Sequence, residues 1–395
     1  MPGFEVFGPE ERAEVLDVLD TGVLFRYGFD AARAGHWKAR SFEAELAARL
    51  GTPYCHLCSS GTAALHVALA ACGIGAGDEV IVPPFTFIAT IEAVLLVGAV
   101  PVFGEIDETL CLDPASIACV VTDRTRAVIP VHMCGSMARI DEISAECAAR
   151  DLILIEDTAQ ALGATFRERA LGTFGSMGCF SFDPVKTITC GEGGAVVTSD
   201  ERLYHRAEQF ADHGHDHVGA DRGLEGHPIL GTNYRVSELQ AAVGLAQLRK
   251  LDGILEVQRR NKAALREAFA AHPEVGFRAI PDPEGDSATF LSIRAPDEAT
   301  ARRWRTALER EGVPGCFYWY DNNWHYPRRW DHLRALATPG RSPLRLLDPP
   351  PDLSRLALPR SDELMARTIS ILVKLSWSEE EIRDLKGRIV RALRG

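Results

Sequence analysis

The sequence lacks the features that would point to a membrane protein or a nucleic-acid-binding protein. Its longest apolar run, over 93–103, is interrupted by Gly98 and Pro101 and is too short to span a bilayer. Basic residues are not in excess, because 43 Lys and Arg stand against 55 Asp and Glu, for a net charge of −12. This balance argues against nucleic acid or an anionic membrane as the main partner.

Signs of export are also missing. The first five residues contain no basic stretch followed by an apolar one, so no secretory signal is visible. Ten cysteines in 395 residues do not make a disulfide scaffold, and we expect reduced thiols. These absences predict a cytoplasmic globular protein.

The sequence does contain ample material for a core and a regular alternation of strands and helices. Hydrophobic residues make up 46% and charged residues 25%, and the length predicts two or three domains, or one large and one small. Up to about residue 200, short apolar strands are expected at 79–82, 100–103, 127–131, 152–156, 179–182 and 195–198, with helices at 42–50, 62–72, 88–97 and 138–149. Buried strands separated by helices predict parallel βαβ units with both faces of the sheet covered.

The pattern changes after about residue 230. Helices are expected at 237–251, 254–271, 298–311 and 379–393, with a break near 252–253 and one clear strand at 288–294. We therefore predict an α/β protein with a large domain over 1–250 and a smaller domain over 251–395.

Ser60, Gly61 and Thr62 stand where a loop is expected to become a helix. Glycine lets the backbone approach a ligand closely, and the first N–H groups of a helix attract an anion such as phosphate. The alternative is an ordinary helix start with a serine or threonine cap.

Asp157 and Lys186 each follow a predicted buried strand. Ligands of parallel sheets collect at the carboxyl ends of strands, which suits Asp157, although the residue would also serve as a helix cap. A lysine held among apolar and glycine residues can have a lowered pKa and form an imine, although most lysines are solvated surface groups. Together, a phosphate seat, an acid and a lysine are what pyridoxal phosphate requires, because they would anchor its phosphate, protonate its ring nitrogen and form its Schiff base.

The motifs that carry a wider resemblance are SGTAA at 60–64, GDEVI at 77–81, PFTF at 84–87, PVH at 130–132, EDTAQ at 156–160, SF at 181–182 before Lys186, GEGG at 191–194 and NYR at 233–235. In this order they resemble the DegT/DnrJ/StrS family of pyridoxal-phosphate sugar aminotransferases over nearly the whole chain. The resemblance implies pyridoxal 5'-phosphate as cofactor. It also implies the fold-type I transferase fold, which is aspartate aminotransferase-like. In that fold a large domain with a mainly parallel sheet between helices is followed by a smaller C-terminal α+β domain.

The resemblance also implies roles for individual residues. Lys186 is expected to form the Schiff base and later to move the substrate proton, and Asp157 to pair with the pyridine nitrogen. The other expected contacts are Gly61, Thr62 and Ser181 at the phosphate, Phe87 against the ring, where the family often has Trp, Gln160 near the ring hydroxyl, and Asn233 at the partner's phosphate. This last contact implies a homodimer with shared active sites. A branch of the family that dehydrates sugars has His in place of the lysine, so Lys186 favours amino transfer.

Several stretches outside these motifs, at 2–8, 25–30, 35–38, 212–217 and 374–377, resemble a branch that aminates an acid sugar. The implied reaction transfers the amino group of L-glutamate to the 8-aldehyde of 3-deoxy-manno-octulosonate, a lipopolysaccharide sugar. Arg26, Lys38 and Arg235 are candidates for binding its carboxylate. The alternatives are an aminotransferase for a nucleotide-linked keto-sugar or a cyclitol, and a non-catalytic sensor or scaffold that binds the same cofactor.

Three other patterns have more ordinary explanations. Cys55 and Cys58 have the spacing of a redox or half-zinc motif, but no second pair completes it, and buried thiols are expected. Histidines at 213, 215 and 217 would suit a metal, whereas the resemblance places them near the active-site mouth; no metal is expected. The aromatic run at 317–320 suits a sugar platform, but a packed edge of the small domain is favoured.

Overall fold

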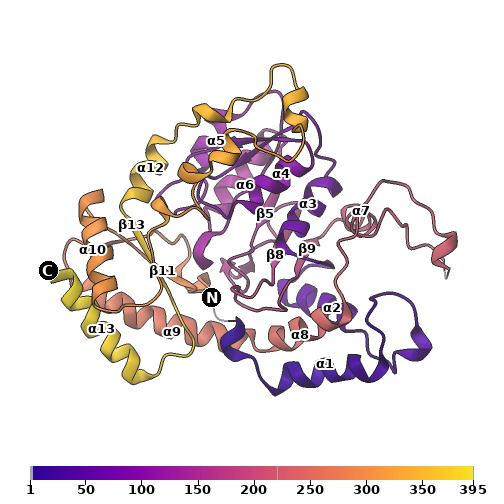
Figure 1. Cartoon of the computed structure of the whole chain (residues 1–395), viewed down its shortest axis with the longest axis horizontal. Coiled ribbons are helices and arrows are strands. Elements are labelled where there is room, and N and C mark those ends of the chain that lie inside the picture. Colours follow the sequence, from indigo (N-terminus) through magenta and orange to yellow (C-terminus); the bar gives the residue numbers. More distant parts are fainter. Residues whose placement is uncertain (1–2, 220, 395) are drawn as a thin grey trace.

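A seven-stranded sheet lies at the centre of the computed structural model, which describes residues 3–219 and 221–394 (Figure 1). Its strands are β1 (Tyr54–Cys58), β2 (Glu79–Val82), β3 (Val100–Phe103), β4 (Thr125–Val128), β5 (Ile153–Asp157), β8 (Met177–Ser181) and β9 (Gly194–Thr198). They are ordered β1-β9-β8-β5-β4-β2-β3. Only β9, among the described strands of this sheet, runs antiparallel to its neighbours, so the sheet is mainly parallel, as expected.

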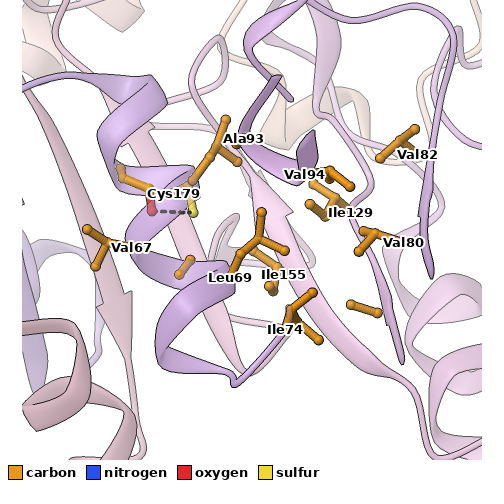
Figure 2. Close-up of a cluster of buried hydrophobic side chains, with 14 of the residues drawn as sticks. Val67, Leu69, Ile74, Val80, Val82, Ala93, Val94, Ile129, Ile155 and Cys179 are labelled. Carbon is orange, nitrogen blue, oxygen red and sulfur yellow. Dashed lines mark hydrogen bonds between the residues drawn. The ribbon is translucent and has the colours of Figure 1, made fainter. Parts of the chain in front are cut away.

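Helices cover both faces of this sheet. They are α1 (Pro9–Thr21), α2 (Lys38–Leu50), α3 (Gly61–Ala71), α4 (Ala89–Leu96), α5 (Pro114–Val120), α6 (Ile140–Ala149), α7 (Glu201–Ala211) and α8 (Glu238–Arg249). Successive residues of a strand point to opposite faces. Val80 and Val82 therefore pack under α3 and α4, as Figure 2 shows, whereas Ile81 packs on the other face with α5 and α6.

The C-terminal part has its own antiparallel sheet, ordered β10-β11-β13-β12. Its elements are α9 (Leu251–Ala270), β10 (Gly276–Phe277), β11 (Phe290–Arg294), α10 (Glu298–Arg310), β12 (Cys316–Phe317), α11 (Asp331–Arg334), α12 (Pro359–Ala366), β13 (Thr368–Leu372) and α13 (Glu379–Arg394), and a small hairpin of β6 (Thr165–Phe166) and β7 (Arg169–Ala170) lies outside both sheets. Helices α9, α10 and α13 enclose the core of this part. Trp319 and Tyr326, however, pack with Ile81 of the large sheet. The division of the chain at residue 250 stays a prediction.

Most expected elements lie within a few residues of their predicted bounds, with two kinds of exception. The break expected near 252–253 is present but lies at Lys250, where α8 and α9 meet. Strands β1 and β13 and helices α1 and α7 were not expected. Strand β13 alternates hydroxyl and aliphatic residues, which is typical of a half-exposed strand, yet Ser370 is buried and its hydroxyl pairs with that of Ser292 on β11 at 2.8 Å.

None of the helices in the described part of the chain combines the length and the apolar composition that crossing a lipid bilayer requires.

Candidate active site

A cavity of about 640 Å³ lies between the carboxyl ends of β5 and β8 and the C-terminal part of the chain. The large sheet and its helices contribute Ser60, Gly61, Thr62, Phe87, Thr90, Asp157, Gln160, Ser181 and Lys186, and the C-terminal part contributes Phe290, Phe317, Trp319, Asn323, Trp324, His325, His332 and Leu372. The structure therefore brings together every residue predicted for the site except Asn233.

One end of the cavity is the N-terminus of α3. The Ser60 hydroxyl caps this helix by accepting the Ala63 N–H at 3.0 Å, and the geometry of a helix start leaves the N–H groups of Gly61 and Thr62 for a ligand. A Cβ atom at Gly61 would lie 2.6 Å from the Cβ of Ser181. Glycine is therefore required here, and both expectations for this motif, the cap and the anion seat, are compatible with the geometry.

Asp157 lies at the end of β5 with only 4% of its surface exposed. Its Oδ2 accepts from the Thr90 hydroxyl at 2.7 Å and its Oδ1 from the Ala159 N–H at 3.1 Å. Burial raises the pKa of this carboxyl, while the Thr90 hydrogen bond and the charge of Lys186 oppose the rise. The residues that follow form a turn and not a helix, so Asp157 is not a helix cap.

Lys186 lies in the loop between β8 and β9, where its backbone N–H donates to the backbone carbonyl of Asp183 at 3.0 Å. The side chain lines the cavity. Burial of the amine lowers its pKa, and the carboxylates of Asp183 and Asp157 partly offset this effect. A lowered pKa increases the neutral fraction of the amine, which is the nucleophilic form.

Thr90 on α4 is a contact of the acid that the sequence did not reveal. Its hydroxyl donates to Asp157, and its oxygen lies 2.7 Å from the Thr86 hydroxyl, which also lies within 3.1 Å of the Phe87 carbonyl. Two consecutive hydroxyls thus fix the orientation of Asp157. The chain offers no pattern that marks a threonine as the partner of a distant acid.

Gln160 orients His325, which was also not predicted. The Gln160 Oε1 accepts the Cys134 N–H at 3.0 Å, so its Nε2 donates to His325 Nε2 at 3.2 Å. His325 therefore carries its own proton on Nδ1, which is buried and has no protein partner within the described chain. Burial, with the charge of Lys186, lowers the pKa of His325 to about 3, so the ring is a neutral hydrogen-bond donor.

Aromatic residues form the wall opposite α3. Phe317 and Trp319 stack with their ring centroids 4.5 Å apart, and the buried Trp319 N–H has no partner within the described chain. Tyr318 points elsewhere and donates to the Ala366 carbonyl at 2.7 Å. The predicted packed edge is thus correct for the run as a whole, but two of its four residues also line the cavity. On the facing side, Phe87 is 43% exposed, with its ring 5.6 Å from that of His325.

Asn233 and the three candidate carboxylate-binding residues do not line this cavity. Arg26 is buried and bonds Glu43 at 2.7 Å, Lys38 bonds Glu14 and Asp17, and Arg235 bonds Asp212. Each cation is already paired with an acid. Arg26 and Lys38 are thus structural residues in the described chain, which is the more ordinary of the two roles expected for them.

The other cysteine and histidine patterns show no ligand-binding arrangement. Cys55 and Cys58 are buried free thiols, and burial raises the pKa of each. His217 stacks on Tyr27 at 4.8 Å, and His215 lies 2.8 Å from Glu225. Within residues 3–219 and 221–394, no three His, Cys, Asp or Glu side chains come together in a way that would hold a metal ion.

Comparison with known proteins supplies the family. The profile of the DegT/DnrJ/EryC1/StrS aminotransferase family matches residues 8–338. The chain belongs to this family. Two relatives are named L-glutamine:2-deoxy-scyllo-inosose aminotransferase. The one from Micromonospora echinospora is 43% identical over 285 residues, which cover 69% of this chain and 65% of the relative. The one from Streptomyces fradiae is 34% identical over 411 residues, which cover 100% and 94%.

A solved aminotransferase from Psychrobacter cryohalolentis superposes with a TM-score of 0.84 at 30% identity, covering 98% of this chain and 97% of that one. The expected fold-type I architecture is thereby confirmed. The protein is a pyridoxal-phosphate-dependent aminotransferase.

Proposed function

We propose that this aminotransferase transfers an amino group from L-glutamine or L-glutamate to the ketone of a neutral, polyhydroxylated ring, a keto-cyclitol. The observation that carries the proposal is the composition of the cavity wall. Lys186 is the only Lys or Arg among the described lining residues, and the C-terminal part of the chain contributes aromatic and other uncharged residues, among them Phe317, Trp319 and the neutral ring of His325. Aromatic faces and neutral polar groups suit the hydroxyls of such a ring. The names of the two relatives point to the same class.

The residues at the sheet end fit the cofactor. The N–H groups of Gly61 and Thr62 would hold its phosphate together with the Ser181 hydroxyl, in the narrow space that a Cβ at residue 61 would fill. Phe87 would cover one face of the ring, and Gln160 would lie near the ring hydroxyl. When bound, pyridoxal phosphate supplies an electron-accepting ring that stabilises negative charge on the substrate carbon.

Lys186 and Asp157 would carry the proton chemistry. With its lowered pKa, the Lys186 amine is suited both to form the covalent link to the cofactor aldehyde and, once released, to accept the proton of the amino donor. Asp157, held by Thr90 and Ala159, would keep a proton on the ring nitrogen. A cationic partner would favour its carboxylate form and so offset the burial that raises its pKa.

His325 and Trp319 would orient the ketone substrate. Each presents a buried N–H without a protein partner, and a substrate hydroxyl oxygen would satisfy both donors. Because Gln160 fixes the proton of His325 on Nδ1, the donor is present at every pH well above about 3.

We also propose that a second copy completes each site. Asn233 lies at the base of the loop between α7 and α8, which projects away from the body of the molecule (Figure 1). This loop carries three exposed apolar side chains, Val218, Leu224 and Leu230, the last 95% exposed. Such residues are typical of a surface that another chain covers. A second copy would also supply the cation that the carboxylate of the amino donor needs. Mixing Lys186→Ala with Asn233→Ala protein should restore activity that neither has alone if the sites are shared.

A panel of carbonyl substrates tests the proposed class. The holoenzyme, first treated with the amino donor, is mixed with a keto-cyclitol, a nucleotide-linked keto-sugar or the octulosonate aldehyde, and the cofactor absorbance is followed with the mass of the product. We expect kcat/KM to be at least about tenfold higher for the keto-cyclitol. A preference for either of the others would overturn this substrate assignment. The absence of any spectral response to amino donors would instead indicate a non-catalytic protein.

A further inference from the structure

The first described residues of the chain lie against the backbone of the loop that carries Lys186. Gly3–Val6 forms a short 3-10 turn, and the Gly3 N–H donates to the carbonyl oxygen of Lys186 at 3.0 Å. In Figure 1 the indigo start of the described chain lies near the middle of the view, beside the junction of α8 and α9. A segment remote in sequence thus contacts the main chain of the proposed catalytic lysine.

The contact leaves little room for a side chain at residue 3. A Cβ atom there would lie 3.0 Å from three backbone atoms, the Lys186 oxygen, the Ile188 carbonyl carbon and the Thr189 nitrogen. Backbone atoms cannot turn aside as the end of a flexible side chain can, and packed interiors transmit such strain. Even a methyl group at this position would therefore press on the backbone of the lysine loop, which must yield by a few tenths of an ångström.

The same segment is attached to the C-terminal part of the chain. The Glu5 carboxylate accepts the Ser376 N–H at 2.9 Å, in the loop between β13 and α13. The Val6 carbonyl accepts from the Lys250 amine at 2.9 Å, where α8 and α9 meet. Val6 and Leu375 also pack on the apolar cluster that contains Ile188 of the lysine loop. Three parts of the molecule are thus held by one short segment.

Two stretches that the family motifs leave without a role meet here. Residues 2–8 and 374–377 stand out in the sequence, and the structure joins the described parts of both through Glu5 and Ser376. Residues 3–6 contact the lysine loop directly, and Leu375 packs on the same apolar cluster as Ile188 of that loop. The two stretches therefore belong to one set of contacts.

We propose that residues 3–6 form a strap that positions Lys186 by holding its backbone against the C-terminal part of the chain. The inference rests on the catalytic role proposed for Lys186. An amine that moves a proton between fixed atoms is sensitive to its backbone, since a misplacement of about 1 Å can cost about a hundredfold in rate. Gly3 and Glu5 do not line the cavity and are positioning residues.

Four variants of the full chain, tagged at the C-terminal end, test the strap. Gly3→Ala introduces the obstructing Cβ, and Glu5→Ala removes the acceptor for Ser376, whereas Glu5→Gln keeps an oxygen there. Gly8→Ala is the matched control, because a Cβ at Gly8 meets only the flexible ends of Glu10, Glu11 and Lys250.

Three readouts are compared in the holoenzyme. For Gly3→Ala we expect kcat to fall about tenfold or more while KM for the amino donor changes less than about twofold. The pH at which the bound cofactor changes absorbance should shift, and amide hydrogen exchange over 182–194 without substrate should accelerate. Glu5→Ala should show smaller changes in the same direction. Glu5→Gln and Gly8→Ala should match the unmodified protein.

Two results would overturn the strap. One is faster exchange in Gly3→Ala with unchanged kcat and unchanged titration, which would show a merely structural contact. The other is a set of variants identical to the unmodified protein in all three readouts. If Gly3→Ala does not fold, the test rests on Glu5→Ala and Glu5→Gln. The strap is supported if only Glu5→Ala lowers kcat and is refuted if the two variants do not differ. Reductive labelling of the unmodified protein separates the two proposals, because a label away from Lys186 refutes the proposed function, whereas a label on Lys186 with normal Gly3→Ala kinetics refutes only the strap.

Discussion

The two ends of the cavity are built differently. At the sheet end, Asp157 is held by hydrogen bonds from Thr90 and Ala159, and the Gly61 turn is closed against Ser181. At the other end, His325 and Trp319 are packed among aromatic rings but leave one buried N–H each without a protein partner. The hydrogen bonds of Asp157 at the sheet end are thus made within the chain, whereas the two N–H groups at the aromatic end are left without an acceptor in the described chain. We infer that the first end determines the chemistry and the second the choice of substrate.

The largest expected effect lies at the sheet end. Lys186→Ala should lower turnover at least about a thousandfold, because it removes both the covalent link to the cofactor and the proton carrier. The measurement is kcat with saturating amino donor and cofactor. Turnover at normal rates would show that another group does this chemistry. Lys386→Ala, which removes a surface lysine of α13 outside the cavity, controls for the loss of a lysine amine.

Gly61→Ala should weaken the binding of the cofactor more than the binding of the substrate. Its Cβ would lie 2.6 Å from the Cβ of Ser181, so the backbone at residue 61 must move away from Ser181 and the proposed phosphate-binding turn must change shape. We expect the Kd for pyridoxal phosphate to rise about tenfold or more, measured by fluorescence titration of the apoprotein. Gly75→Ala, where a Cβ meets nothing within 4 Å, is the control. Equal affinities for both variants would contradict the proposed seat.

His325→Gln tests the aromatic end. The variant loses a fixed N–H donor, so KM for the ketone should rise about tenfold while the Kd for the cofactor stays within about twofold. His205→Gln on α7, whose side chain is exposed, is the matched control. A larger effect on cofactor binding than on KM would break the division between the two ends.

Thr90→Val should have a smaller effect on the chemistry. It removes the hydroxyl that orients Asp157 but keeps the shape of the side chain, so we expect kcat to fall about threefold to tenfold. For Thr86→Val, whose effect would reach Asp157 through Thr90, we expect a smaller decrease in kcat. An order reversed between the two variants would show that the hydroxyls do not act through Asp157.

The smallest expected effect is on stability against acid. The pKa of His325 falls from its ordinary value of 6.5 to about 3 in the fold, so below pH 6.5 the unfolded chain binds a proton that the folded chain does not. The apoprotein should therefore lose stability between about pH 6.5 and pH 3. The free energy of unfolding of His325→Gln, measured by urea unfolding, should decrease less than that of the unmodified protein between about pH 6.5 and pH 3. Parallel pH curves for the two proteins would show that His325 is not buried as a neutral ring.

The sequence predicted the sheet end better than the aromatic end, for a physical reason. Gly61, Asp157 and Lys186 follow strands or begin a helix, and parallel strands deliver such positions to one edge of the sheet. Gln160 and His325, by contrast, are 165 residues apart, and a stretch without regular structure brings them together. Such contacts depend on the packing of loops, which no local pattern encodes. The same holds for Thr90, a residue inside a helix whose partner lies on another element.

The most direct test of the account is to locate the cofactor on the chain. The purified holoenzyme is reduced with borohydride and digested, and the labelled peptide is sequenced by mass spectrometry. The account predicts a single pyridoxyl label on Lys186, lost when the amino donor is added before reduction. A label on any other lysine, or none at all, would contradict it.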